Sequence, residues 1–149
     1  MGVEIERKFL VDLKDIDYKK YPCLSLEQGY LATKPVVRVR KENDTYYLTY
    51  KGKGSLSREE YNLPLTKESY EHLLAKADGN IITKHRYLIP YDKYTIELDE
   101  FLGKFAPLFL AEVEFESVEE ANSFMAPSWF IEDVTGNPKY TNANMSKAL

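Results

Sequence analysis

Residues 3–9, Val-Glu-Ile-Glu-Arg-Lys-Phe, alternate between apolar and charged side chains. In an extended strand, successive side chains point to opposite faces, so Glu4, Glu6 and Lys8 share one face. The opposite face carries Val3, Ile5 and Phe9. The stretch therefore predicts a β-strand with one ionisable face and one apolar face.

The same period of two recurs in seven further segments, which are 26–32, 36–40, 45–51, 58–63, 84–86, 94–99 and 111–115. Turn-forming residues separate them, which predicts a largely antiparallel order of eight strands. Two segments have helical spacing instead: 66–78, followed by Gly79, and 117–126, where Ser117 and Glu120 can form a capping box. The tail over 135–149 is polar and predicts loop with one helical turn.

The charged faces have two interpretations. On a half-buried sheet they would simply point to water. However, the signs segregate by strand, since Glu4 and Glu6 are acidic whereas Arg38 and Arg40 are basic. An eight-stranded closed sheet has room for side chains or one small ligand. The alternative to a solvated face is therefore a closed sheet of these eight strands.

Closing this barrel would bring two sets of charges into one lumen. The cations are Lys8, Arg38, Arg40, Lys51, Arg58, Lys84 and Arg86, and the carboxylates are Glu4, Glu6, Glu60, Glu97, Asp99, Glu112 and Glu114. Burying so many charges without partners would be prohibitive, so the interior must hold water and ions.

Composition narrows the class of protein. The 149 residues suit one domain, 1–149, and the net charge of −4 argues against general nucleic-acid or membrane-surface binding. One cysteine and two histidines argue against a disulfide framework and a zinc site. No apolar run reaches the roughly 20 residues of a membrane span. We expect a soluble, cytoplasmic protein; its oligomeric state stays open, and a homodimer is one option.

The lumen charges suit a particular kind of ligand. Carboxylates from two strands make an all-oxygen site, which Mg²⁺ or Mn²⁺ prefers. Arginine and lysine side chains match phosphate oxygens, the former as a bidentate fork. A divalent cation beside a cationic wall describes a site for a polyphosphate, and no nucleic-acid partner is expected.

Glu4-Ile5-Glu6-Arg7-Lys8 resembles the ExExK signature of the CYTH, or triphosphate tunnel metalloenzyme, superfamily. The resemblance covers most of the chain, because further motifs follow in the expected order: Arg38-x-Arg40, Lys51, Arg58-x-Glu60, Lys84-x-Arg86, Glu97-x-Asp99 and Glu112-x-Glu114. It implies an α+β fold, an eight-stranded antiparallel β-barrel (tunnel) with helices packed on the outside. It also implies metal ligation by Glu4, Glu6 and the last pair, with Glu114 preferred over Glu112. It also implies that Lys8, Arg38, Arg40, Lys51, Lys84 and Arg86 hold phosphates. We add Asp99 to the metal candidates and Arg58 to the phosphate candidates.

The superfamily hosts several activities, so membership does not name the substrate. The length is typical of short bacterial members, which look most like inorganic triphosphatases. This resemblance implies metal-dependent hydrolysis of inorganic tripolyphosphate to pyrophosphate and phosphate, with nucleoside triphosphates as further substrates. A class IV-type adenylate cyclase and a non-catalytic module that binds polyphosphate or nucleotide are the alternatives.

Three residues are candidates for activating the attacking water. Tyr30 lies on a polar face, and paired with Lys84 it could orient or deprotonate the water, as a Tyr–Lys pair is thought to do in some short relatives. A hydroxyl that merely bonds a neighbour explains Tyr30 equally well. Glu60 is the competing base, unless it forms an ion pair with Arg58 or Arg40. Lys139 and Tyr140 could cover the tunnel mouth.

Overall fold

A computed structural model describes residues 2–149 of the chain. Within this range the chain forms nine strands, β1 (Gly2–Val11), β2 (Cys23–Thr33), β3 (Val36–Glu42), β4 (Thr45–Lys51), β5 (Ser57–Pro64), β6 (Asp78–Tyr91), β7 (Tyr94–Phe101), β8 (Phe109–Glu114) and β9 (Phe130–Asp133). The helices are α1 (Lys67–Leu74), α2 (Val118–Ser123) and α3 (Asn142–Met145), with single 3₁₀ turns η1 (Tyr18–Lys20), η2 (Gly103–Phe105) and η3 (Pro138–Tyr140).

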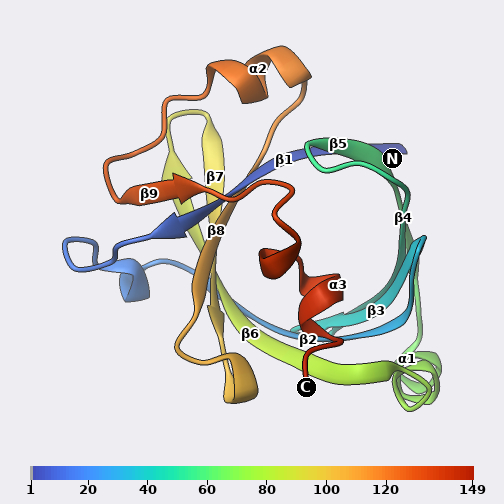
Figure 1. The fold of residues 1–149 in the computed structure, drawn as a ribbon. Coiled ribbons are helices and arrows are strands. Elements are labelled where there is room, and N and C mark those ends of the chain that lie inside the picture. Colours follow the sequence, from blue (N-terminus) through green and yellow to red (C-terminus); the bar gives the residue numbers. More distant parts are fainter. Residues whose placement is uncertain (1) are drawn as a thin grey trace.

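Eight antiparallel strands close into a barrel (Figure 1). Their order is β5-β4-β3-β2-β6-β7-β8-β1, and β5 pairs with β1 through the register Glu4 opposite Arg58. The predicted barrel of eight strands is therefore confirmed. The sequence patterns missed β9, which pairs with the end of β1 beyond the barrel wall.

The two predicted helices are present but shorter than expected. Thr66 caps α1, since its hydroxyl accepts a hydrogen bond from the Ser69 amide at 3.0 Å. The predicted segment 66–78 ends as a helix at Leu74, because Asp78 already begins β6. Ser117 caps α2 in the same way, whereas the Glu120 carboxylate accepts from the Glu116 amide rather than from Ser117.

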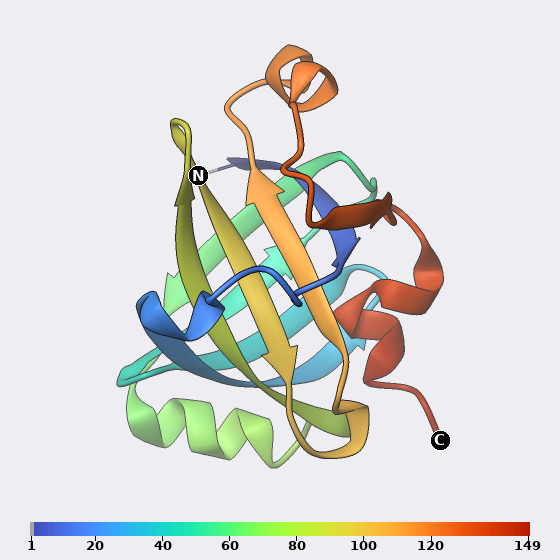
Figure 2. The ribbon, with the colours of Figure 1, turned by 90° about the vertical axis from the view of Figure 1, so that its left-hand side faces the viewer.

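One apolar core lies outside the barrel. The outward side chains of β6, β7 and β8, such as Leu98 and Val113, are fully buried. The chain after β1 covers them with Tyr18, and the region around α2 covers them with Ala121 and Phe124. Figure 2 shows η1 lying over these strands. No described helix has both the length and the apolar character needed to cross a membrane.

A second apolar core fills one end of the barrel interior. Its buried members are Tyr30, Val36, Ile82, Phe101, Leu110, Val134 and Met145. Met145 comes from α3, which lies across one opening of the barrel in Figure 1. The charged lumen therefore does not run uniformly from end to end, because apolar side chains and the C-terminal segment close this side.

Candidate active site

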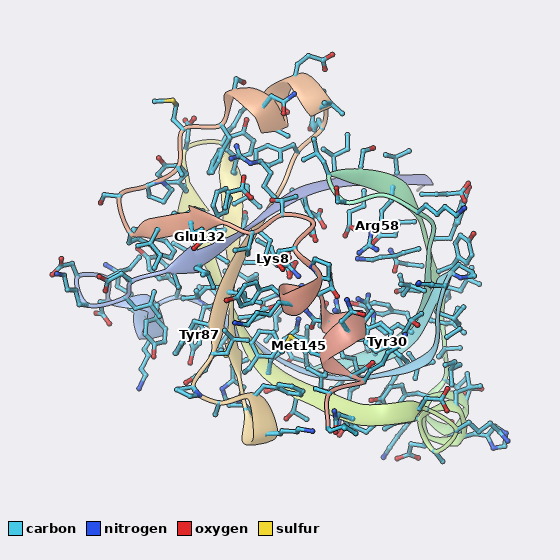
Figure 3. The ribbon with its side chains drawn as sticks, viewed as in Figure 1. Lys8, Tyr30, Arg58, Tyr87, Glu132 and Met145 are labelled. Carbon is cyan, nitrogen blue, oxygen red and sulfur yellow. The ribbon has the colours of Figure 1, made fainter. Side chains whose placement is uncertain are left out.

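A cavity of about 400 Å³ occupies the remaining interior of the barrel. All seven predicted cations line it, and so do six of the seven predicted carboxylates: Glu4, Glu6, Glu60, Glu97, Glu112 and Glu114. The alternation of the strands accounts for this convergence, because inward and outward residues alternate along every barrel strand. Figure 3 shows Lys8, Tyr30 and Arg58 around the interior, from β1, β2 and β5.

Three carboxylates gather at one side of the cavity. Glu4, Glu6 and Glu114 each present an oxygen within 4.8 Å of the others. Glu6 and Glu114 are directly opposite in the antiparallel pairing of β1 and β8. Burial and the neighbouring Glu112 and Glu4 raise the pKa of Glu6 well above its usual value. Burial and the charges of Glu4, Glu60 and Glu112 also raise the pKa of Glu114.

Glu4 differs from the other two because it has cationic partners. Both of its carboxylate oxygens accept hydrogen bonds from the Lys51 ammonium, at 3.1 and 3.0 Å. Burial alone would raise the pKa of Glu4, but the ammonium outweighs burial and lowers it. Arg58 lies 3.6 Å from the same carboxylate. Lys51 also lies 3.6 Å from Glu60, which therefore pairs with Lys51 rather than with Arg58 or Arg40.

Glu112 and Asp99 are not members of this three-carboxylate group, although Glu112 lies near enough to raise the pKa of Glu6 and Glu114. Glu112 lies 3.8 Å from both Lys8 and Arg86. Burial would raise its pKa, but the surrounding cations, Lys8 first, lower it well below the usual value. Asp99 is completely buried and is absent from the cavity lining.

Asp99 instead supports two cations from β6. Its carboxylate accepts two hydrogen bonds from Arg86, at 2.8 and 2.9 Å, and lies 2.7 Å from the Lys84 ammonium. Burial lowers the pKa of Lys84 to about 7, although Asp99 acts in the opposite direction. Lys84 is therefore a buried amine that can exchange a proton near neutral pH.

Two guanidinium groups from β3 lack such a partner. Arg38 and Arg40 are both buried, and neither forms an ion pair with any of residues 2–149. Arg38 donates to the Thr49 hydroxyl at 3.2 Å, and its Nε has no hydrogen-bond partner. Burial and the charges of Arg38 and Arg86 lower the pKa of Arg40. These groups are suited to an anion that approaches from the cavity.

Tyr30 lines the cavity at its border with the inner apolar core. Within the described chain no hydrogen bond joins its hydroxyl to Lys84, whose ammonium bonds Asn142 at 2.9 Å besides contacting Asp99. The expected Tyr–Lys contact is therefore not formed in this structure.

Sequence patterns missed the polar residues that support the cations. Gln28 is completely buried and accepts a hydrogen bond from Arg40 at 2.7 Å. Asn142, in the tail that was expected to be mostly loop, lines the cavity. The tail does lie at the mouth, because the Tyr140 carbonyl accepts from the Lys8 ammonium at 3.0 Å. Gln28 shares the alternation of β2 and could have been found, whereas no local signal marks Asn142.

Comparisons with known proteins agree with this geometry. The model of a family described as the CYTH domain matches residues 2–144. An inorganic triphosphatase from Nitrosomonas europaea is 38% identical over 98% of this chain and 98% of its own length. One from Acetivibrio thermocellus is 38% identical over 99% of this chain and 95% of its own. A crystal structure of an inorganic triphosphatase superposes with a TM-score of 0.70 at 34% identity, covering 98% of this chain and 95% of that one.

Proposed function

Since the chain belongs to the CYTH domain family, we propose that its barrel hydrolyses a triphosphate with the help of a divalent cation. We favour inorganic tripolyphosphate as the substrate, because both curated relatives are inorganic triphosphatases. The products would be pyrophosphate and phosphate.

The observation that carries this proposal is the pair of buried guanidinium groups without a counter-charge. Arg38 and Arg40 face a cavity that Lys8, Lys84 and Arg86 also line. A buried cation is costly unless an opposite charge compensates it. A flexible chain of phosphate groups would supply several negative oxygens to these donors at once, and Arg58 and Lys51 would extend the same wall towards the acidic group.

The acidic group fits a divalent cation. Its ligands are all carboxylate oxygens, the donors that Mg²⁺ and Mn²⁺ prefer. Burial and neighbouring carboxylates raise the pKa values of Glu6 and Glu114 despite the nearby Lys51, and a bound cation would offset this repulsion. When bound, the cation would neutralise phosphate oxygens and polarise the phosphoryl group under attack. Glu4, Glu6 and Glu114 are the proposed ligands.

Lys84 is the leading candidate for handling the proton of the attacking water. An amine with a pKa of about 7 is present in both protonation states at neutral pH, which suits general acid–base catalysis. Tyr30 could assist after a side-chain movement. Glu60 remains a second candidate for the base, although its proximity to Lys51 favours a supporting role.

A phosphate-release screen tests the proposal. The purified protein is incubated with tripolyphosphate, ATP, thiamine triphosphate or pyrophosphate, each with Mg²⁺ or Mn²⁺. We expect the highest kcat/KM with tripolyphosphate. Without a divalent cation we expect no phosphate release from any of the substrates. Formation of cyclic AMP from ATP would identify a cyclase instead. Tight binding of tripolyphosphate without turnover would identify a binding module.

A matched pair of variants connects any turnover to the lumen. Arg40→Ala removes a cation from the inward face of β3, and Lys41→Ala removes one from the next position, which points outward. Only Arg40→Ala should raise KM for tripolyphosphate. Equal effects of the two substitutions would argue that hydrolysis takes place elsewhere.

A further inference from the structure

A short chain of neutral side chains connects two cations on β3 and β6, the strands on either side of β2. Asn142 Oδ1 accepts hydrogen bonds from the Lys84 ammonium at 2.9 Å and from Gln28 Nε2 at 3.0 Å. Gln28 Oε1 in turn accepts from Arg40 Nε at 2.7 Å. The chain therefore runs from Lys84 on β6, through α3 and β2, to Arg40 on β3.

The two cations dictate the orientation of both amides. Arginine has no acceptor atom, so the Gln28 atom that faces Arg40 must be the carbonyl oxygen. The Gln28 amide nitrogen then faces Asn142, which must present its own oxygen. The ammonium of Lys84 donates to that same oxygen. Each link thus determines the next, and an apolar side chain at position 142 would interrupt the chain.

The two amides hold Lys84 and Arg40 in place without adding negative charge. A carboxylate at the same point would compete with an anionic substrate for both cations, whereas an amide oxygen offers only a dipole. Asp99 already holds Lys84 from one side, and Asn142 supplies the second contact. Two contacts restrict the ammonium more closely than either contact alone.

The helix that carries Asn142 is anchored independently of the cavity. Met145 is buried in the inner apolar core, and the Asn80 side chain donates to its carbonyl at 3.2 Å. The Asn80 amide also donates to the Ser146 carbonyl at 2.6 Å. Next to it, Gly79 has a φ of +68°, and a Cβ there would lie 2.0 Å from the Ser146 oxygen. These contacts bind α3 to the start of β6.

We propose that Asn142 is a positioning residue, which fixes Lys84 directly and Arg40 through Gln28, so that α3 completes the active site. The proposal rests on the proposed triphosphatase function. Asn142 acts through the two cations, which are the groups that would touch the substrate. It deepens that function by assigning part of the catalytic geometry to the C-terminal segment.

Three substitutions on α3 test it. Asn142→Leu keeps the approximate shape but removes the acceptor oxygen, and Asn142→Asp keeps an oxygen at that place. Asn144→Ala, on the same helix, removes a hydrogen bond to the Pro138 carbonyl of η3. With tripolyphosphate, Asn142→Leu should lower kcat by about 10- to 100-fold, the scale of a small displacement in an active site, and raise KM only severalfold. Asn142→Asp should recover most of kcat but raise KM further, since it adds negative charge. Asn144→Ala should change neither constant.

Equal kcat values for Asn142→Leu and Asn144→Ala would overturn the proposal, and so would an Asn142→Asp variant as slow as Asn142→Leu. Melting curves show whether each variant is folded. Asn80→Ala weakens the anchoring of α3 without changing a residue of the cavity, so it should lower kcat less than Asn142→Leu does. This variant replaces Asn142→Leu in the test if Asn142→Leu does not fold. If the unmodified protein binds but does not hydrolyse tripolyphosphate, the proposed function fails separately. Calorimetric titration then decides, because Asn142→Leu should weaken binding severalfold relative to Asn144→Ala, and equal affinities would overturn the positioning role.

Discussion

The buried charges on the two sides of the cavity are compensated in different ways. On the cationic side, Asp99 compensates Lys84 and Arg86, and Asn142 and Gln28 hold Lys84 and Arg40 with neutral oxygens. On the acidic side, Glu6 and Glu114 face each other across β1 and β8 with raised pKa values. Only Glu4 of that group has close cationic partners.

The difference indicates which side needs a ligand more. The cations are largely held in their places by protein contacts, so this side is ready to receive an anion. On the acidic side, each proton that is lost adds a negative charge and increases the repulsion among the carboxylates. A bound cation would compensate this repulsion. The four predictions below change one side at a time.

The largest effect should come from the support of the cationic side. Asp99→Asn removes the carboxylate nearest to Lys84 and Arg86, and breaking a buried ion pair in this way costs about 3–5 kcal/mol of unfolding free energy. Urea denaturation measures it. Glu100→Gln, one position along β7 and on the outer face, is the matched control. A loss below about 1 kcal/mol for Asp99→Asn would contradict the assigned role of Asp99.

Next in size is the removal of one carboxylate from the acidic side. Glu6→Gln keeps the shape of the side chain but removes a proposed metal ligand, so turnover of tripolyphosphate with Mg²⁺ should fall by at least about 100-fold. Glu132→Gln, on the exposed strand β9, should leave turnover unchanged. Retained Mg²⁺-dependent turnover in Glu6→Gln would refute the ligand assignment.

A third comparison concerns ligand binding on the cationic side. Tripolyphosphate with a divalent cation should raise the melting temperature far more than NaCl of equal ionic strength, since saturation at about 100 times Kd stabilises by roughly 2.7 kcal/mol. Arg38→Ala combined with Arg40→Ala should lose most of that increment. Differential scanning fluorimetry measures both. An unmodified protein that tripolyphosphate does not specifically stabilise would count against the anion site itself.

The smallest effect is a dependence of stability on pH. Because the folded-state pKa of Glu6 lies above the usual value of 4.5, its contribution to stability is full below that value and is lost as pH rises through the folded-state pKa. The Glu6→Gln variant has no titratable carboxyl group at this position, so its stability does not fall in this way. The melting temperature of Glu6→Gln minus that of the metal-free unmodified protein should therefore increase from pH 4.5 upward, and added Mg²⁺ should reduce the difference. A difference that stays constant with pH would argue against a repulsive acidic group.

The alternation of side chains predicted the strands and which residues share a face, and the resemblance to the CYTH superfamily predicted that the sheet closes. Glu4, Glu6, Arg38, Arg40 and Glu114 were expected to face one interior, and they do. A strand has only two faces, so a period of two reports directly which residues lie together once the sheet closes. The alternation did not predict the short strand β9, because four residues are too few to show a period of two.

Local patterns could not tell which charges would become partners. Asp99 was expected beside a metal, but the register of β6 and β7 sets it opposite Arg86. Glu60 was predicted as a candidate base, with an ion pair to Arg58 or Arg40 as the alternative, and β4 and β5 bring it opposite Lys51. Register across strands depends on how turns and cores fit together, and nothing within a single strand encodes it.

By itself, then, the sequence determined the strands, the charged face of each and the class of ligand, because these follow from the repeat of each strand and the chemistry of its side chains. Tertiary structure alone decided that apolar residues fill one end of the barrel and that Asn142 reaches Lys84 and Gln28. These contacts join residues that are 58 and 114 positions apart. Contacts over such separations arise only when the anchoring of α3 to β6 brings the end of the chain back to the cavity.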